Sequence, residues 1–178
     1  MKTIIIYKSK SGYTKTYAQW ISEELSCDIQ EAEKISPDDF TQYQIIIFGG
    51  GLYASGINGL KLITQNFDSL QNKHIFVWAT GSNPGRQEEL DEVWKYNFTP
   101  EQLQKIKTFY LRGGFDFSKL SIPDKILMRM LKRKLKATKV RSEDEEGMLK
   151  AYQFPENYCN KENITLLVKN IRDLERGE

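Results

Sequence analysis

The residue types best suited to binding chemistry gather near the start of the chain, directly after its first apolar run. Three of the six residues in this segment are serines or threonines, whose hydroxyl groups can donate hydrogen bonds to phosphate oxygens, and a lysine between them can add positive charge. A glycine in the same segment permits a turn in which the backbone comes close to a ligand. The residues are Ser9, Lys10, Ser11, Gly12, Tyr13 and Thr14.

The elements around this segment place it at the start of a helix. Residues 3–7 have the apolar composition of a buried strand. The residues after the segment show helical spacing, and the apolar side of this helix includes Tyr17, Ala18, Trp20 and Ile21. The first N–H groups of a helix lack intrahelical partners, and the helix dipole adds partial positive charge there. This arrangement predicts an anion site, and a terminal phosphate monoester suits it.

Residues 9–14 do not match two other well-known phosphate-binding motifs. The P-loop of nucleotide triphosphatases needs two glycines followed by Lys and Ser or Thr, whereas this segment has a single glycine and no Gly-Lys pair. The dinucleotide fingerprint needs three glycines, which are also missing. An ordinary polar turn with a Ser or Thr cap remains the alternative interpretation.

Length and composition indicate one globular domain over residues 1–178. The net charge of +2 gives no general case for nucleic-acid binding. With only Cys27, Cys159 and His74, the chain offers no disulfide scaffold, zinc site or Cys-His nucleophile. The sequence has no run of 18 apolar residues and no signal peptide, so we expect a cytoplasmic protein.

Strand-like and helix-like patterns alternate along the rest of the chain. Apolar runs at 44–48 and 73–79 are typical of buried parallel strands, and glycine-rich loops follow both, at 49–56 and 79–85. Such alternation predicts an α/β fold with a doubly wound, five-stranded parallel sheet. Ligands of such sheets lie beyond the carboxyl ends of the strands, where the three loops would converge. Further strands are expected at 27–33 and 107–112, and further helices at 57–70, 87–96 and 160–176.

The pattern Ser-x-Ser-Gly-x-Thr after the first strand resembles the phosphate loop of flavodoxins, and nearly the whole chain resembles the flavodoxin-like family. This resemblance implies strand order 2-1-3-4-5 and FMN as cofactor, with its 5′-phosphate in the first segment. It also implies flavin-centred chemistry without a catalytic side chain, with a backbone group near Gly50 or Gly51 at flavin N5. The residues implied to flank the flavin ring are Gly51, Leu52, Tyr53 and Ala54 on one side, and Thr80, Gly81, Ser82 and Asn83 on the other.

Two features differ from an ordinary flavodoxin. The chain is slightly basic, and Tyr53 is the one aromatic residue in the ring-flanking segments, because Trp78 precedes the third loop and is expected in the core. The second feature is an extra segment at 115–141, which is similar to a stretch of the menaquinone-dependent protoporphyrinogen oxidase family. That resemblance implies a porphyrinogen-like substrate and a quinone or a redox protein as partner.

The extra segment contains a basic amphipathic helix that begins at Pro123. Such a helix suits an anionic membrane surface, at the inner face of the membrane, or an acidic partner. The alternative is a surface helix that packs on the domain, with its charges solvated or paired with the acidic residues 143–146. Its apolar side comprises Ile126, Leu127, Met130, Leu131 and Leu135, and its cations are Lys125, Arg129, Lys132, Arg133, Lys136, Lys139 and Arg141.

Together these features predict an FMN-binding oxidoreductase, with protoporphyrinogen dehydrogenation linked to a quinone as its specific form. Two alternatives stay open. One is a flavodoxin-type electron-transfer protein without a substrate of its own. The other is a cofactor-free binding or regulatory module that uses the basic helix.

Overall fold

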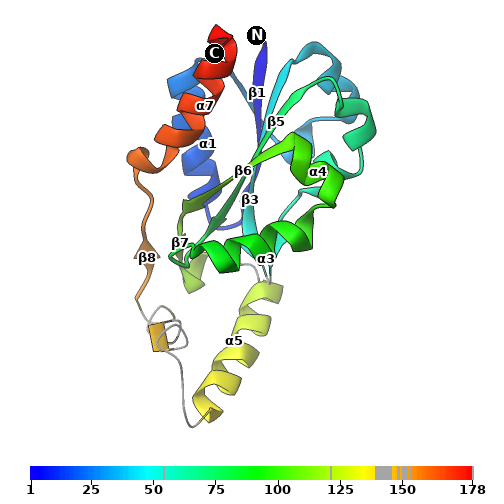
Figure 1. Cartoon of the computed structure of the whole chain (residues 1–178). Coiled ribbons are helices and arrows are strands. Elements are labelled where there is room, and N and C mark those ends of the chain that lie inside the picture. The colour runs from blue at the N-terminus through cyan, green and yellow to red at the C-terminus, as the bar shows by residue number, and fades with distance from the viewer. Residues whose placement is uncertain are drawn as a thin grey trace.

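A parallel sheet with helices on both faces forms the body of the protein (Figure 1). The computed structural model describes residues 1–53, 55–120, 122–138, 146–147, 149, 152 and 154–177. The five parallel strands lie in the order β2-β1-β3-β5-β6, which confirms the predicted order. Their bounds are Thr3–Lys8 (β1), Asp28–Glu31 (β2), Ile45–Tyr53 (β3), His74–Gly81 (β5) and Ile106–Arg112 (β6). The two-residue strand β4, Gly56–Ile57, pairs with β3 in the antiparallel direction.

Alternate residues of the central strands build two hydrophobic cores, one on each face of the sheet. Ile46 and Phe48 of β3 belong to one core, and Ile45 and Ile47 belong to the other. All four side chains are fully buried. A strand covered on both faces needs apolar residues at every position, which explains the continuous apolar run that predicted it.

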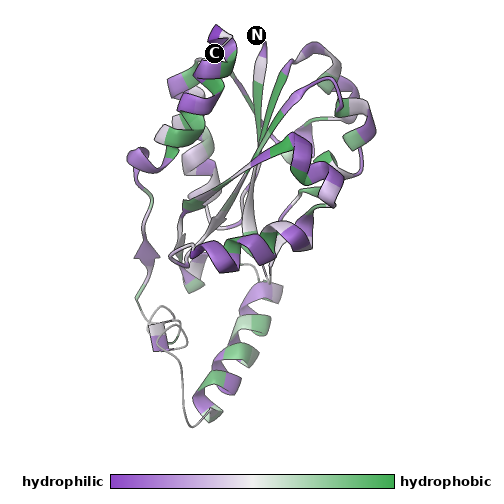
Figure 2. Ribbon diagram, in the orientation of Figure 1, coloured by the Kyte–Doolittle hydropathy of each residue, from purple (hydrophilic) through white to green (hydrophobic). Residues whose placement is uncertain are grey.

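The helices divide between these two faces (Figures 1 and 2). On one face, α1 contributes Tyr17 and Ile21 to the core and α7 contributes Leu167. On the other face, Ile63 of α2 and Trp94 of α3 pack over the sheet. The α-helices of the body are α1 (Tyr13–Leu25), α2 (Lys61–Thr64), α3 (Gln87–Asn97), α4 (Pro100–Lys105) and α7 (Thr165–Arg176). Short 3-10 helices span Ala32–Lys34, Pro37–Gln42, Phe67–Leu70, Phe117–Lys119 and Lys161–Ile164.

The helix predicted over 57–70 is wrong in extent. The structure has β4, the single turn α2 and a 3-10 turn in its place. Gly59 has a φ of +79°, which no right-handed helix accommodates, and the Asn66 side chain donates to the carbonyl of Leu62 at 2.9 Å and ends the turn. The short helix α4 was not predicted, although Thr99 and Gln102 form a capping box around Pro100.

A long excursion leaves the sheet after β6 and returns before α7. It begins with β7 (Gly114–Phe115), continues through α5 (Ile122–Ala137), and ends with β8 (Glu156–Asn157). β7 and β8 pair antiparallel, and the Tyr158 N–H donates to the carbonyl of Gly113 at 2.7 Å. The two ends of the excursion are therefore joined at its base, and α5 projects from the carboxyl edge of the sheet (Figure 1). Among the described residues, no helix has the length and apolar character needed to cross a membrane.

Candidate functional site

The three segments predicted to bind a ligand end at the same edge of the sheet. Lys8 at the end of β1 is in register with Gly50 of β3, and Gly51 is in register with Thr80 of β5. Contacts between the segments are close. A Cβ atom placed on Gly51 would stand 3.7 Å from Oγ1 of Thr14, and one placed on Gly81 would stand 3.3 Å from Cδ1 of Leu52. The second segment therefore lies between the first and the third.

The first segment leaves the amino end of α1 without a side-chain cap. Gly12 occupies the cap position with a φ of +94°, and no side chain accepts a hydrogen bond from the first turn there. The Ser9 hydroxyl instead accepts a hydrogen bond from the Gly12 N–H at 3.1 Å, which shapes the turn. Thr14 is 3% exposed and lies in the first turn of the helix. The backbone donors of this turn thus keep their capacity to bind an anion.

Lys10 connects the first segment to the excursion. Its ammonium lies 3.0 and 3.1 Å from the two carboxylate oxygens of Asp124, in the first turn of α5. The same ammonium lies 4.4 Å from the centroid of the Tyr53 ring. Burial, and then the negative charge of Asp124, raise the pKa of Tyr53 to about 12, although a hydrogen bond with Ser11 acts in the opposite direction.

The side chain of Tyr13 does not point toward an anion site. Its hydroxyl donates to the carbonyl of Glu156 in β8 at 3.0 Å, and its ring is 8% exposed. Burial raises the pKa of this hydroxyl. Tyr13 therefore links the base of the excursion to α1, and only its backbone N–H remains at the predicted anion site.

The second segment was predicted as a loop, but the structure continues β3 through Tyr53. β4 folds back on it, so that Leu52 pairs with Ile57. Asn97 of α3 fixes this hairpin, because its side chain accepts from the Ile57 N–H at 2.8 Å and donates to the carbonyl of Ser55 at 2.6 Å. The prediction for Ala54 lies outside the described residues.

The third segment contains a buried hydroxyl without a partner. Thr80 is 6% exposed, and its Oγ1 has no hydrogen-bond partner among the described residues. Such a group costs free energy unless a ligand or water satisfies it. A hydrogen bond from the Gly113 N–H to the carbonyl of Gly81, 2.7 Å long, fixes the backbone of Gly81.

Two side chains that were not predicted to contact this segment hold the rest of it. The Tyr110 hydroxyl donates to the carbonyl of Asn83 at 2.6 Å, and Nε of Arg112 donates to the carbonyl of Ser82 at 3.0 Å. Both residues belong to β6, the neighbouring strand. The sequence feature that could have predicted this contact is the position of Arg112 at a strand end, directly before two glycines.

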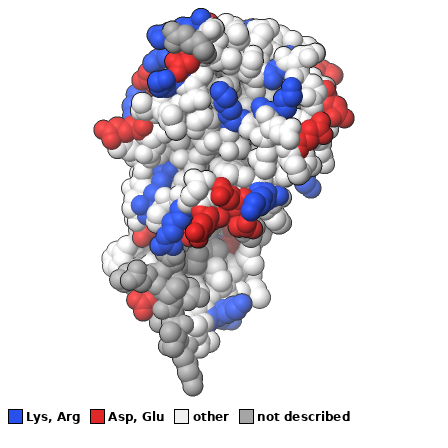
Figure 3. Space-filling model, in the orientation of Figure 1, with Lys and Arg blue, Asp and Glu red and all other residues white. Residues whose placement is uncertain are grey.

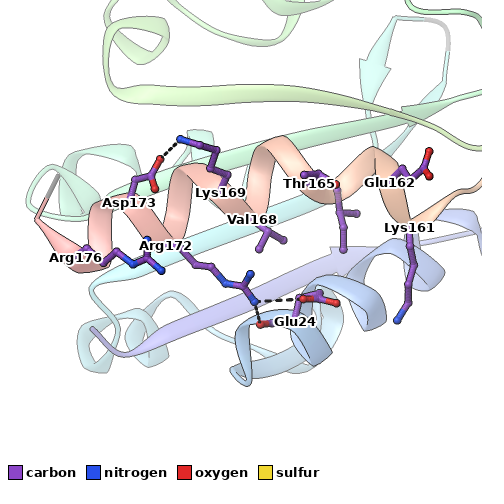
Figure 4. A pocket seen from close by; sticks show the side chains of 10 residues that line it. Glu24, Lys161, Glu162, Thr165, Val168, Lys169, Arg172, Asp173 and Arg176 are labelled. Carbon is purple, nitrogen blue, oxygen red and sulfur yellow. Dashed lines mark hydrogen bonds and ion pairs between the residues drawn. The ribbon is translucent and has the colours of Figure 1, made fainter.

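A separate surface groove of about 580 Å³ lies between α7 and the end of α1, away from the carboxyl edge (Figure 4). Four of its charged side chains form ion pairs with one another. Arg172 pairs with Glu24 at 3.3 Å, and Lys169 pairs with Asp173 at 2.6 Å. One ion pair joins α7 to α1 and the other lies within α7. Because both have a structural role, we assign the groove no part in the site.

The fold and the edge geometry define a doubly wound α/β protein with an uncapped helix amino end at its first strand-to-helix turn. The family model described as "Flavodoxin domain" matches residues 4–142, so the chain belongs to that family. An uncharacterised protein of Methanocaldococcus jannaschii is 36% identical over 87 residues, which are 47% of this chain and 57% of that protein. The match thus spans little more than half the length of that relative.

The chain is also similar to solved structures of low sequence identity. The flavodoxin, WrbA-like protein of Agrobacterium tumefaciens is 16% identical, with a TM-score of 0.48 over 73% of this chain and 91% of that one. A flavoprotein of Lactobacillus acidophilus, solved in complex with FMN, is 17% identical, with a TM-score of 0.41 over 62% of this chain and 91% of that one.

Proposed function

We propose that this protein binds FMN at the carboxyl edge of its sheet, with the 5′-phosphate at residues 9–14, and that it acts as a flavin-dependent oxidoreductase. The observation that carries the proposal is the uncapped amino end of α1, surrounded by hydroxyl groups and adjoined by the two further predicted segments. Membership of the flavodoxin domain family supports it.

The residues present fit the cofactor. The first turn of α1 supplies backbone N–H groups, Ser11 and Thr14 supply hydroxyls, and Lys10 supplies charge, which together suit a phosphate dianion. The partnerless hydroxyl of Thr80 supplies a hydrogen-bonding group for the polar edge of a flavin. The apolar side chain of Leu52 lies beside Gly81, the next residue along the chain, and suits an aromatic ring.

FMN, when bound, supplies the electron-transfer chemistry, and the chain supplies orientation and access. Gly50 contributes to orientation because it permits a close backbone approach: a Cβ there would stand 2.5 Å from the carbonyl oxygen of Asn58. β4 is pressed against β3 at this point. The hairpin, held by Asn97, thus fixes the backbone of the second segment.

The visible absorption spectrum of the purified protein tests this function. Protein incubated with FMN and then freed of unbound flavin is expected to carry flavin bands at one flavin per chain, and riboflavin is expected to bind more weakly because it lacks the phosphate. Anaerobic titration with dithionite should bleach the bands. Protein that stays colourless and does not quench FMN fluorescence would refute the proposal and favour a cofactor-free binding module.

The specific activity we propose is oxidation of a porphyrinogen-like substrate with a quinone as acceptor. The excursion supports an enzyme over a simple electron shuttle, because its helix α5 touches the phosphate segment through Asp124 and Lys10. Tyr53 as the one aromatic side chain of the ring-flanking segments leaves more room for a substrate than two would. Anaerobic reduction of the bound flavin by protoporphyrinogen, followed by reoxidation with menadione, tests this form. Flavin that a reductase reduces but protoporphyrinogen does not would favour the electron-transfer protein.

The substitution Asp124→Asn is expected to tighten FMN binding about fivefold at low salt. The carboxylate of Asp124 competes with the phosphate for the Lys10 ammonium and repels the phosphate, while the asparagine removes that charge and keeps the side-chain shape. Fluorescence titration with FMN and with riboflavin measures the effect. Riboflavin affinity should not change, and Asp173→Asn, whose carboxylate pairs on α7, serves as the control. A weaker FMN complex in Asp124→Asn would show that the carboxylate helps to hold the cofactor.

A further inference from the structure

Helix α5 exposes a continuous apolar stripe on its outer side. Ile126 and Met130 lie one turn apart, with exposed fractions of 55% and 63%, and Ile122 one turn earlier is 76% exposed. Leu127 beside them is 62% exposed. These four are among the largest exposed hydrophobic side chains of the chain, and they lie on a single helix. An apolar stripe of this kind on a protein surface indicates an interaction.

Contacts on the opposite side of the helix fix the direction in which the stripe points. Leu135 is 6% exposed, and the Tyr152 hydroxyl donates to the Met128 carbonyl at 2.6 Å. The ammonium of Lys132 lies 4.9 Å from the Tyr152 ring centroid. Asp124 binds Lys10 of the body on this same side. The helix is therefore anchored by its inner side, and the stripe faces outward.

The charges along α5 are almost all positive. Asp124 is the single acidic residue of the helix, and its carboxylate is bound to Lys10. Elsewhere on the body, acidic side chains gather over α3 (Figure 3). Basic residues accompany the stripe along α5, and they are Lys125, Arg129, Arg133, Lys134 and Lys136.

We propose that the outer side of α5 docks on the surface of a lipid bilayer that contains anionic lipids. The stripe would enter the boundary between headgroups and acyl chains, while the lysines and arginines of α5 would contact phosphate headgroups. Charge complementarity selects this occupant. A second copy docked through the same stripe would bring these cations against identical cations, which is unfavourable.

Docking by this side has a geometric consequence for the candidate site. The first turn of α5 is joined to the phosphate segment by the pair of Lys10 and Asp124, so the carboxyl edge of the sheet would lie close to the bilayer. A lipid-soluble electron acceptor could then reach the edge directly. This consequence rests on the proposed function, whereas the docking itself does not require FMN.

Co-sedimentation with vesicles tests the docking. The full chain is expected to sediment with vesicles of phosphatidylcholine and phosphatidylglycerol at low salt, and about tenfold less with phosphatidylcholine alone or at high salt. The double variant Ile126→Gln/Met130→Gln and the double variant Arg133→Gln/Lys134→Gln are each expected to lose binding by about tenfold or more. Circular dichroism and FMN titration of each variant report on folding and on the cofactor site separately.

Matched control variants distinguish binding through α5 from nonspecific binding of the protein to vesicles. Leu166 on α7 has the same exposed fraction as Met130, 63%, so Leu166→Gln should leave vesicle binding unchanged. Lys61→Gln/Lys105→Gln removes two exposed charges elsewhere and should reduce binding by less than twofold. Equal losses in the controls, or no sedimentation of the parent chain with anionic vesicles, would overturn the proposal. A parent chain that dimerises without lipid, and becomes monomeric in the stripe variant, would overturn it in favour of a second copy.

Discussion

Replacing Ser11 and Thr14 together with alanine is expected to weaken FMN binding by about 2 kcal/mol, or roughly thirtyfold. Both hydroxyls lie at the uncapped amino end of α1, and Thr14 is buried there. A hydrogen bond to a charged phosphate contributes more than one between neutral groups, and buried phosphate oxygens left without donors add a desolvation cost. Fluorescence titration of FMN against the apoprotein measures the change.

Riboflavin and a remote pair of hydroxyls provide the controls for this substitution. Riboflavin lacks the phosphate, so its affinity should be the same in the double variant and in the parent chain. Thr41 and Ser69 donate to backbone carbonyls at exposed turns, so Thr41→Ala/Ser69→Ala should leave FMN affinity unchanged. If FMN affinity stayed the same, or fell together with riboflavin affinity, the phosphate would have to be assigned to another segment.

The sheet was predictable from sequence because its signals are local. Each central strand is a continuous apolar run, and β3 and β5 end in glycines. Such a run has few structures other than a strand covered on both faces. The alternation of strands and helices then indicated a doubly wound parallel sheet, and the resemblance to flavodoxins implied the order of its strands. Helix limits were less predictable where a single residue decides them. The apolar residues of the segment 57–70 have helical spacing, yet the positive φ of Gly59 prevents a continuous helix there.

The first segment was predictable for the same reason, since its residues are contiguous. The contacts that tie it to the excursion were not. Lys10 and Asp124 are separated by 114 residues, and no periodicity relates them. Tyr13 likewise resembles a ligand-binding residue by position, but the return of the chain through β8 places an acceptor, the carbonyl of Glu156, at its hydroxyl. These contacts join residues that are far apart in the sequence, so short-range sequence patterns do not predict them.

Substituting Gly49 with alanine is expected to destabilise the protein by about 3 kcal/mol. Gly49 on β3 is in register with Trp78 on β5, and the Trp78 side chain is fully buried. A Cβ on Gly49 would overlap the six-membered ring of the Trp78 indole, and close packing leaves the ring no space to retreat. Urea denaturation followed by tryptophan fluorescence and circular dichroism measures the loss, which should appear as a lower midpoint at unchanged slope.

The cause of this loss can be isolated by relieving the overlap. Trp78→Phe removes the atoms that a Cβ on Gly49 would meet, so the double variant Gly49→Ala/Trp78→Phe should be more stable than the sum of the two single effects by at least about 1 kcal/mol. Gly56→Ala is the matched control, because a Cβ there would stand 3.4 Å from its nearest neighbour. That substitution should change stability by less than about 1 kcal/mol. Simple additivity of the Gly49 and Trp78 effects would mean that the glycine is required for its backbone and not for the space it leaves. The space for the Trp78 indole would then not depend on the missing side chain of Gly49.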